Sequence, residues 1–190
     1  MPAADAPTAA PATPAPALAL VDFWRQSSGH WFSKSAPFDQ RFRDRFLALH
    51  EAAARRELDD WGRTPCGSLA LLILLDQFPR NAFRGTRRMY ATDVLARQHA
   101  RTAVAAGHMD RVDPALRLFF CLPFAHSEDL ADQDRSVELN TLIGPAAREH
   151  ALGHRNIIVR FGRFPHRNPL LGRQTTAAEQ AFLDRGGFAG

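Results

Sequence analysis

The sequence predicts an all-α protein, and three observations support this prediction. After Leu18 no long run alternates between apolar and polar residues, whereas apolar residues recur at spacings of three and four. Caps and first-turn prolines, such as the Thr64 and Pro65 pair, open several of these segments. Hydrophobic residues make up 45% of the chain and charged residues 23%, as in ordinary globular proteins. We therefore expect about eight helices with short connections, stacked as antiparallel pairs.

The chain is expected to form a single domain behind a tail. Its 190 residues suit one domain with a core that needs no disulfide or metal. Residues 1–17 are almost entirely Ala and Pro, so they bury too little apolar surface to offset the entropy of ordering them. We expect a flexible, extended tail over residues 1–17 and one helical domain over residues 18–190.

The first half of the domain contains two clear helix signals. Pro37 suits a first turn, and apolar residues at spacings of three and four follow it over residues 37–58, so one face packs inward. Thr64 and Pro65 then open a segment that is apolar on every side, which predicts a central helix. Pro79 is expected to end that helix, because the residue before a proline is pushed out of the helical region.

Caps and first-turn prolines predict five further helices in the second half. Their expected starts are Thr92, Asp113, Ser127, Pro145 and Thr176. Thr176 and Glu179 together have the spacing of a capping box. Pro123 lies inside the strongly apolar helix that follows Asp113, so we expect it to kink or stop that helix.

The charge pattern argues against a nucleic-acid or membrane partner. The net charge is +4 and the pI is near 10.0. However, Lys34 is the only lysine and the arginines are scattered among acidic residues, so no cationic patch would follow a phosphate backbone. The apolar run at 69–75 is too short to span a bilayer, and the N-terminus lacks the basic region of a secretory signal.

The cysteines and histidines indicate neither a metal site nor a cofactor. Cys66 and Cys121 lie far apart and sit in or beside apolar runs, so we expect reduced core residues and a cytoplasmic protein. His150 and His154 have the i, i+4 spacing of a two-point metal grip, but the sequence places no third ligand and lacks the HExxH arrangement. We therefore expect no metal and no cofactor.

Helical spacing places several polar side chains on inward faces. His126 and Gln133 fall on one apolar stripe, and His150 and His154 fall on the stripe of the next helix. Asp76 follows seven apolar residues near a helix C-terminus, where the helix dipole opposes a carboxylate. We expect a nearby arginine to neutralise Asp76.

Two Phe-Pro motifs are the best candidates for a site. "DQFPRN" at 76–81 and "RFGRFPHRN" at 160–168 each place Arg and Asn just after a Phe-Pro step that should end a helix. If the motifs converge, the floor of the site would contain Arg80, Asn81, Arg163, Arg167 and Asn168, with His126, Gln133 and His154 as walls. Such a site would suit a carboxylate or a phosphate. The alternative is a hydrogen-bonded brace between helix ends.

Three functions are compatible with these residues. The first is a binding module in which arginines hold a small anionic metabolite or the carboxylate of a peptide. The second is an enzyme with His126 or His166 as general acid or base, oriented by Asp76 or Glu128. The third is a structural or interaction protein whose buried polar residues only fix the order of the helices.

Several motifs together resemble the bacterial domain of unknown function 924 family. They are "DFWR" at 22–25, "WF" at 31–32, "LLDQFPRNAFRGT" at 74–86, "FFCLPFAHSEDLADQ" at 119–133 and "HRNIIVRFGRFPHRNPLLGRQTTAAEQAFL" at 154–183. The resemblance covers the chain from about Leu18 to Phe188. It implies a helical fold of the tetratricopeptide-like superfamily and no established activity.

Overall fold

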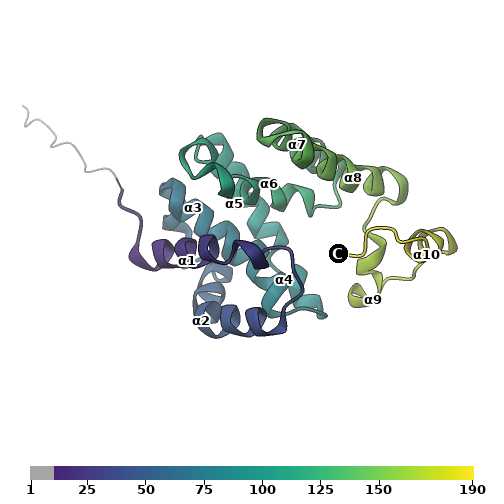
Figure 1. Ribbon diagram of the computed structural model, residues 1–190, viewed down its shortest axis with the longest axis horizontal. Helices are drawn as coiled ribbons and strands as arrows, with labels where there is room; N and C mark the ends of the chain where they lie inside the picture. The colour runs from purple at the N-terminus through teal and green to yellow at the C-terminus, as the bar shows by residue number, and fades with distance from the viewer. Residues whose placement is uncertain (1–10) are drawn as a thin grey trace, which may run out of the picture.

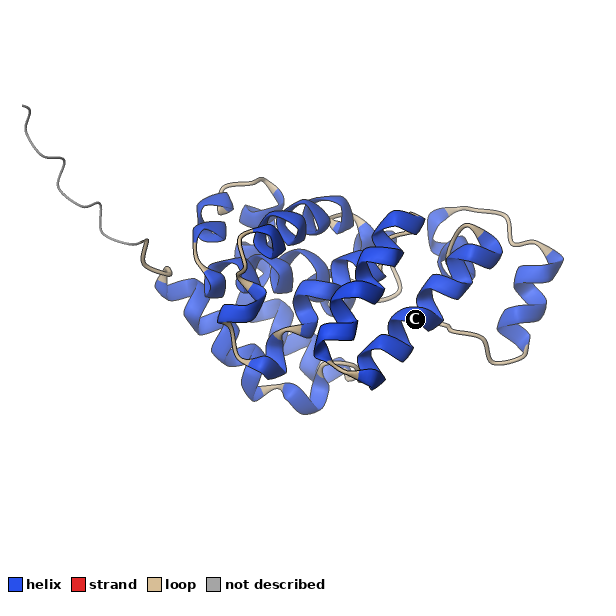
Figure 2. Ribbon diagram, turned by 90° about the horizontal axis from the view of Figure 1, so that it is seen from above, coloured by secondary structure: helices blue, strands red, loops and turns tan. Residues whose placement is uncertain are grey.

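The computed structural model describes residues 11–190, and all regular secondary structure in that range is helical, which confirms the all-α prediction. Figures 1 and 2 show helices joined by loops, with no strand in this part of the chain. The helices are α1 (Ala15–Gln26), α2 (Ala36–Ala54), α3 (Pro65–Leu72), α4 (Phe78–Ala82), α5 (Asp93–Ala105), α6 (Leu118–Ala125), α7 (Leu130–Ile143), α8 (Pro145–Phe161), α9 (Asn168–Leu171) and α10 (Ala177–Asp184). None is long and apolar enough to cross a bilayer.

The first helix begins inside the segment that was expected to be a tail. Residues 1–10 lie outside the described residues, but α1 begins at Ala15 rather than at residue 18. Ala17 is fully buried because it lies on the same helix face as Leu20 and Trp24. The Thr13 hydroxyl also donates a hydrogen bond to the Thr64 hydroxyl, at 2.8 Å. The expected boundary is therefore wrong, since small alanines can pack on a helix face.

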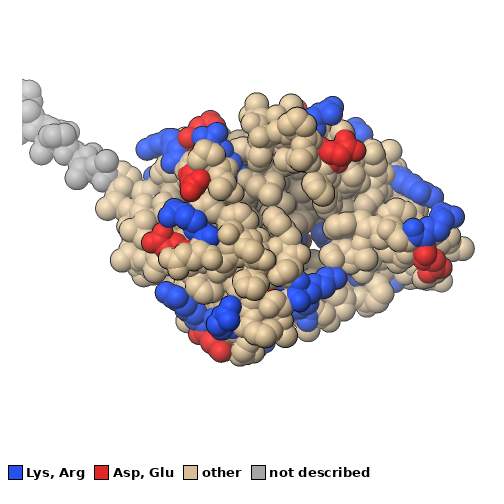
Figure 3. Space-filling model, viewed as in Figure 1, with Lys and Arg blue, Asp and Glu red and all other residues tan. Residues whose placement is uncertain are grey.

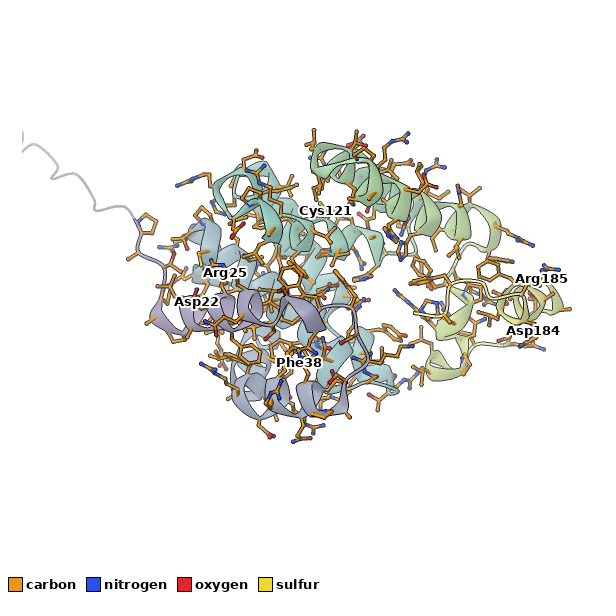
Figure 4. The ribbon with its side chains drawn as sticks, in the orientation of Figure 1. Asp22, Arg25, Phe38, Cys121, Asp184 and Arg185 are labelled. Atoms are coloured by element: carbon orange, nitrogen blue, oxygen red, sulfur yellow. The ribbon has the colours of Figure 1, made fainter. Side chains whose placement is uncertain are left out.

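The main core lies among α1, α2, α3, α5 and α6. Phe38 is fully buried, stacks on Phe23 and lies between α1 and α2 (Figure 4). The stretch from Leu69 to Leu75 is at most 1% exposed at every residue, which confirms that α3 is central. This packing fixes the positions from which the polar side chains of the next turn project.

Pro79 does not end the helix that begins at Pro65. A π-helical turn, Ile73–Gln77, joins α3 to α4, and helical structure continues to Ala82. The prediction of a helix end at Pro79 is therefore wrong. Pro79 has no N–H to donate to the preceding turn, so the helix can continue only if other donors reach the freed carbonyls.

Side chains from neighbouring elements supply these donors. The Thr92 hydroxyl donates to the Leu75 carbonyl oxygen at 2.5 Å, and His50 Nδ1 lies 2.9 Å from the Leu74 carbonyl oxygen. Thr92 was expected to cap α5, but its side chain makes no capping hydrogen bond there. Tertiary hydrogen bonds thus replace the bond that Pro79 cannot make.

Two details around α6 and α7 differ from the simplest expectation. Pro123 lies within α6, which continues to Ala125, so this proline does not stop the helix. Ser127 does not cap α7, because the Asp129 side chain accepts hydrogen bonds from the N–H groups of Ala131 and Asp132. Ser127 instead donates its hydroxyl to Asp132 at 2.7 Å. A serine and an aspartate two residues apart are equally good caps by sequence, so the pattern alone could not separate them.

The C-terminal part follows its predicted boundaries closely. The helix α8 spans Pro145–Phe161 as expected, and Thr176 and Glu179 form the predicted capping box of α10. A second, smaller core of Ile157, Ile158 and Phe164 lies here. Figure 1 shows α9 and α10 at the opposite end from α1, with the last residue between them and the N-terminal helices.

Candidate functional site

The two Phe-Pro motifs meet at Asp93, in the first turn of α5. Arg80 of the first motif makes a bidentate ion pair with Asp93, with nitrogen-to-oxygen distances of 2.9 and 3.1 Å. Arg167 of the second motif approaches the same carboxylate at 3.8 Å. One carboxylate therefore connects two segments that lie far apart in the sequence.

The hydrogen bonds of Arg80 tie α4 to α5. Its Nη1 atom donates to the Asp76 carbonyl oxygen at 2.7 Å and lies 3.2 Å from the Asp76 carboxylate, besides contacting Asp93. Burial alone would lower the pKa of this guanidinium, but the two carboxylates raise it above its usual value. The expected pairing of Asp76 with a nearby arginine is present.

Asp76 also orients His126, which lies at the C-terminal end of α6. The Nδ1 atom of His126 is 2.7 Å from Asp76 Oδ1, and the Gln77 side chain donates to Oδ2 at 2.6 Å. Burial opposes ionisation of Asp76, but Arg80 and His126 hold its pKa below the usual value. The π-helical turn makes this arrangement possible because it directs both Asp76 and Gln77 inward.

His126 keeps one nitrogen free. An ionised carboxylate only accepts hydrogen bonds, so Nδ1 carries the proton and Nε2 has a lone pair. The side chain is 17% exposed, and no residue in the described part of the chain hydrogen-bonds to Nε2. Burial and Arg80 lower the pKa of His126, so the ring is neutral at neutral pH. The pair has the geometry of an oriented general base.

Arg167 is the unusual residue of the site. It is only 7% exposed, yet its guanidinium donates no hydrogen bond to any of residues 11–190, and Nε is buried without a partner. The guanidinium lies over the rings of Tyr90 and Phe164, 4.7 and 4.6 Å from their centroids. Burial and the nearby Arg80 lower its pKa from the usual value.

Two histidines and Phe188 form a wall near Arg167. The Phe188 ring is 4.6 Å from the His154 ring and 5.2 Å from the His166 ring, centroid to centroid. Burial lowers the pKa of His154 to about 4 and that of His166 to about 3, so both are neutral at neutral pH. Arg167 contributes to both shifts, which places it close to these rings.

The surface is hollowed where the N-terminal helices face the C-terminal segment. Figure 3 shows this hollow near the middle of the molecule, with Lys or Arg atoms at its depth. Nitrogen-bearing side chains project toward it from both sides in Figure 4. Lys34 is the only lysine of the chain, so arginines supply nearly all of the positive charge.

Three of the expected site residues form a brace instead. Arg163 makes a bidentate ion pair with Glu179, at 2.6 and 2.9 Å, and Asn168 donates to the same carboxylate. Glu128 does not orient His126, because it accepts from the Phe164 N–H and pairs with Arg173. These contacts hold the second motif against α10 and against the loop that precedes α7.

Two more expected residues are also occupied within the fold. Gln133 is fully buried and donates to the carbonyl oxygens of Ala125 and Ser127. Asn81 is buried, donates to the Gln77 carbonyl oxygen and accepts from Arg84. His150, expected on an inward face, is exposed. The two motifs therefore form a hydrogen-bonded brace that also contains Arg167, a buried arginine with unused donors. They match neither the expected site nor the expected brace alone.

The structure adds Tyr90, Asp93 and Phe188 to the site. Asp93 had no distinctive signal, because the helix dipole already accounts for a carboxylate in the first turn of a helix. Tyr90 and Phe188 had none, since their roles come from tertiary contacts. Across residues 11–190, no group of three His, Cys, Asp or Glu side chains is arranged to hold a metal ion.

The fold and the site together define an all-helical protein with a buried network of arginines, carboxylates and a histidine. Residues 20–187 match the family described as bacterial protein of unknown function (DUF924), and the chain belongs to this family. This confirms the resemblance of the sequence motifs. The tetratricopeptide-like classification stays a prediction.

One solved structure supports the fold closely. It is that of a protein of unknown function, ATU0120, from Agrobacterium tumefaciens, with 53% sequence identity and a TM-score of 0.90. The match covers 92% of this chain and 100% of that chain. The comparison with curated proteins finds no match.

Proposed function

We propose that this protein binds a small anion, a phosphate or a carboxylate, at the guanidinium of Arg167. The single observation that carries this proposal is the buried guanidinium of Arg167, which hydrogen-bonds to none of residues 11–190. Buried arginines are costly unless their N–H groups are satisfied, and a phosphate or carboxylate is the bidentate partner that suits them best.

Hydrogen bonding, and not net charge, supports the proposal. Arg80 and Arg167 are balanced in charge by Asp76 and Asp93. However, Arg80 already binds both oxygens of Asp93, so this carboxylate is a poor partner for a second guanidinium at 3.8 Å. A ligand would supply the acceptors that the fold does not.

Thermal unfolding with phosphate, lactate and peptide carboxylates tests this proposal. A ligand that binds only the folded state stabilises it by about 2.7 kcal/mol at one hundred times its Kd. We expect the wild type to be stabilised by at least one of these anions and Arg167→Met not to be. Arg55→Met is the matched control, because Arg55 is exposed and pairs only with Glu57. Equal stabilisation of wild type and Arg167→Met, or none in either, would contradict the proposal and favour the purely structural role.

An enzyme is the second candidate, and the Asp76–His126 pair specifically favours it. A neutral imidazole held by a carboxylate and reachable at Nε2 is suited to accept a proton from a bound substrate or water. The test is a screen of phosphate and carboxylate esters for turnover by wild type and by His126→Gln. Turnover that survives this substitution unchanged would exclude His126 as the base.

The proposed location is the cytoplasm. Cys121 is buried and Cys66 is half-buried, and both are free thiols in the structure. Reduced core cysteines are typical of cytoplasmic proteins. Fractionation of cells that express the tagged protein would test this placement, with recovery outside the cytoplasm as the contrary result.

A further inference from the structure

We propose that the site selects anions that carry their own proton donor, such as monohydrogen phosphate or a 2-hydroxycarboxylate. Arg167 would bind the charge, and His126 Nε2 would accept a hydrogen bond from the ligand. This inference rests on the proposed anion binding and adds the chemical class of the ligand. Its basis is the pairing of one unsatisfied donor group with one unsatisfied acceptor.

Arg80 links His126 to Arg167 through two carboxylates that both contact its Nη1 atom. Its Nη1 atom is 3.2 Å from Asp76 Oδ1 and 2.9 Å from Asp93 Oδ1. His126 is attached to the first of these carboxylates and Arg167 lies against the second. The two groups are therefore held in fixed relation by a buried chain of ion pairs, and a small molecule could contact both.

The carboxylate of Asp76 decides which role His126 plays. Because Nδ1–H donates to Asp76, the neutral ring can only accept at Nε2. His166 Nδ1 is a second ring nitrogen without a partner near Arg167, and the His126→Phe variant distinguishes the two rings. Two other neighbouring side chains do not compete for this role. His154 Nδ1 is bonded to the His150 carbonyl oxygen, and Arg80 is a cation that disfavours a second charge on the ring.

The wall residues add no further cation to the site. His154 and His166 are neutral and pack against Phe188, so they present rings and no cation. Tyr90 adds a further ring beneath Arg167. One strong cation and one neutral acceptor fit a small ligand with one anionic group and one hydroxyl.

Matched pairs of ligands test this selectivity in the wild-type protein. Phosphate and sulfate have the same shape, but sulfate carries no proton at neutral pH; lactate and propionate differ in the same way by a hydroxyl group. Isothermal titration should show phosphate binding at least about tenfold more tightly than sulfate, because an unpaired buried acceptor is costly. The lactate and propionate pair shows whether the anionic group is a phosphate or a carboxylate.

A substitution locates the discrimination at His126. His126→Phe keeps a ring but removes the acceptor, so phosphate and sulfate should bind this variant with equal affinity. His99→Phe is the matched control, because His99 also pairs with an aspartate, Asp59, at 3.2 Å and is 13% exposed. This control should keep the preference for phosphate.

The outcomes separate the two proposals. If the wild type binds both members of each pair with equal affinity and Arg167→Met binds neither, the selectivity is overturned and anion binding stays in place. If no anion binds the wild type, anion binding fails and the selectivity fails with it. The wild-type comparison decides the matter even if His126→Phe does not fold.

Discussion

Arg80 and Arg167 occupy matching positions in two similar motifs, yet their surroundings differ. Arg80 donates to the Asp76 carbonyl oxygen and to both carboxylate oxygens of Asp93, so its guanidinium N–H groups have partners within the fold. Arg167 is similarly buried but hydrogen-bonds to none of residues 11–190. The difference teaches that burial of a charge alone does not identify a site. A buried charge with unused donors does.

The comparison makes a clear prediction for the saturated arginine. Arg80→Met should reduce the free energy of unfolding by about 3 to 5 kcal/mol, because it leaves Asp76 and Asp93 buried without their main cation. Urea unfolding measures this loss. Arg55→Met, which breaks an exposed pair, should leave the free energy of unfolding nearly unchanged. A similar small cost for Arg80→Met would remove the contrast between the two motifs.

We expect the next largest loss of unfolding free energy from a substitution at Thr92, because the helix continues through Pro79 only with the hydrogen bond from this side chain. Thr92→Val should cost about 1 to 3 kcal/mol, since it strands the buried Leu75 carbonyl oxygen without a donor. Thr92→Ser retains the hydroxyl and serves as the control. Equal unfolding free energies for the Val and Ser variants would show that the helix does not need this hydrogen bond.

Acidification tests whether His154 and His166, the two histidines near Arg167, have lowered pKa values in the folded protein. In the folded protein the pKa is about 4 for His154 and about 3 for His166, compared with 6.5 for an ordinary histidine. The unfolded chain therefore binds more protons than the folded protein below about pH 6.5, so stability falls as pH decreases from there toward the folded values. Asp76 adds a loss below about pH 4, because its folded pKa is depressed. Urea midpoints across this range should show a shallower slope for His166→Asn than for wild type. An identical slope would mean that His166 titrates normally.

Arg167→Met should have the smallest effect on folding. Its guanidinium donates no hydrogen bonds, and the recovered desolvation offsets the lost packing on Tyr90, so the unfolding free energy should stay within about 1 kcal/mol of wild type. A loss as large as that of Arg80→Met would identify Arg167 as a structural residue.

Much of the fold could be predicted because it depends on local signals. Pro145 fixed the start of α8, and the Thr176 and Glu179 spacing fixed the start of α10. The prediction at Pro79 failed because Thr92 supplies a donor from a distant part of the chain. A local rule about proline cannot include such a tertiary contact.

The site was harder to predict than the fold for the same reason. Helical spacing indicated that His126 and Gln133 face inward, and both are buried or nearly so. Spacing could not show that the Gln133 amide nitrogen donates to two backbone carbonyl oxygens while His126 keeps a free nitrogen. Likewise, Arg163 and Arg167 are equivalent by sequence, and only the position of Glu179 opposite Arg163 separates them.

The most direct test compares the two arginines in one spectrum. Titration of phosphate into the labelled protein, followed through arginine guanidinium NMR resonances assigned with the Arg80→Met and Arg167→Met variants, reports which guanidinium meets the ligand. We predict that the Arg167 resonance shifts with saturable dependence on phosphate and that the Arg80 resonance stays in place. An unmoved Arg167 resonance, or equal small shifts of all arginines including exposed Arg55, would contradict the central claim.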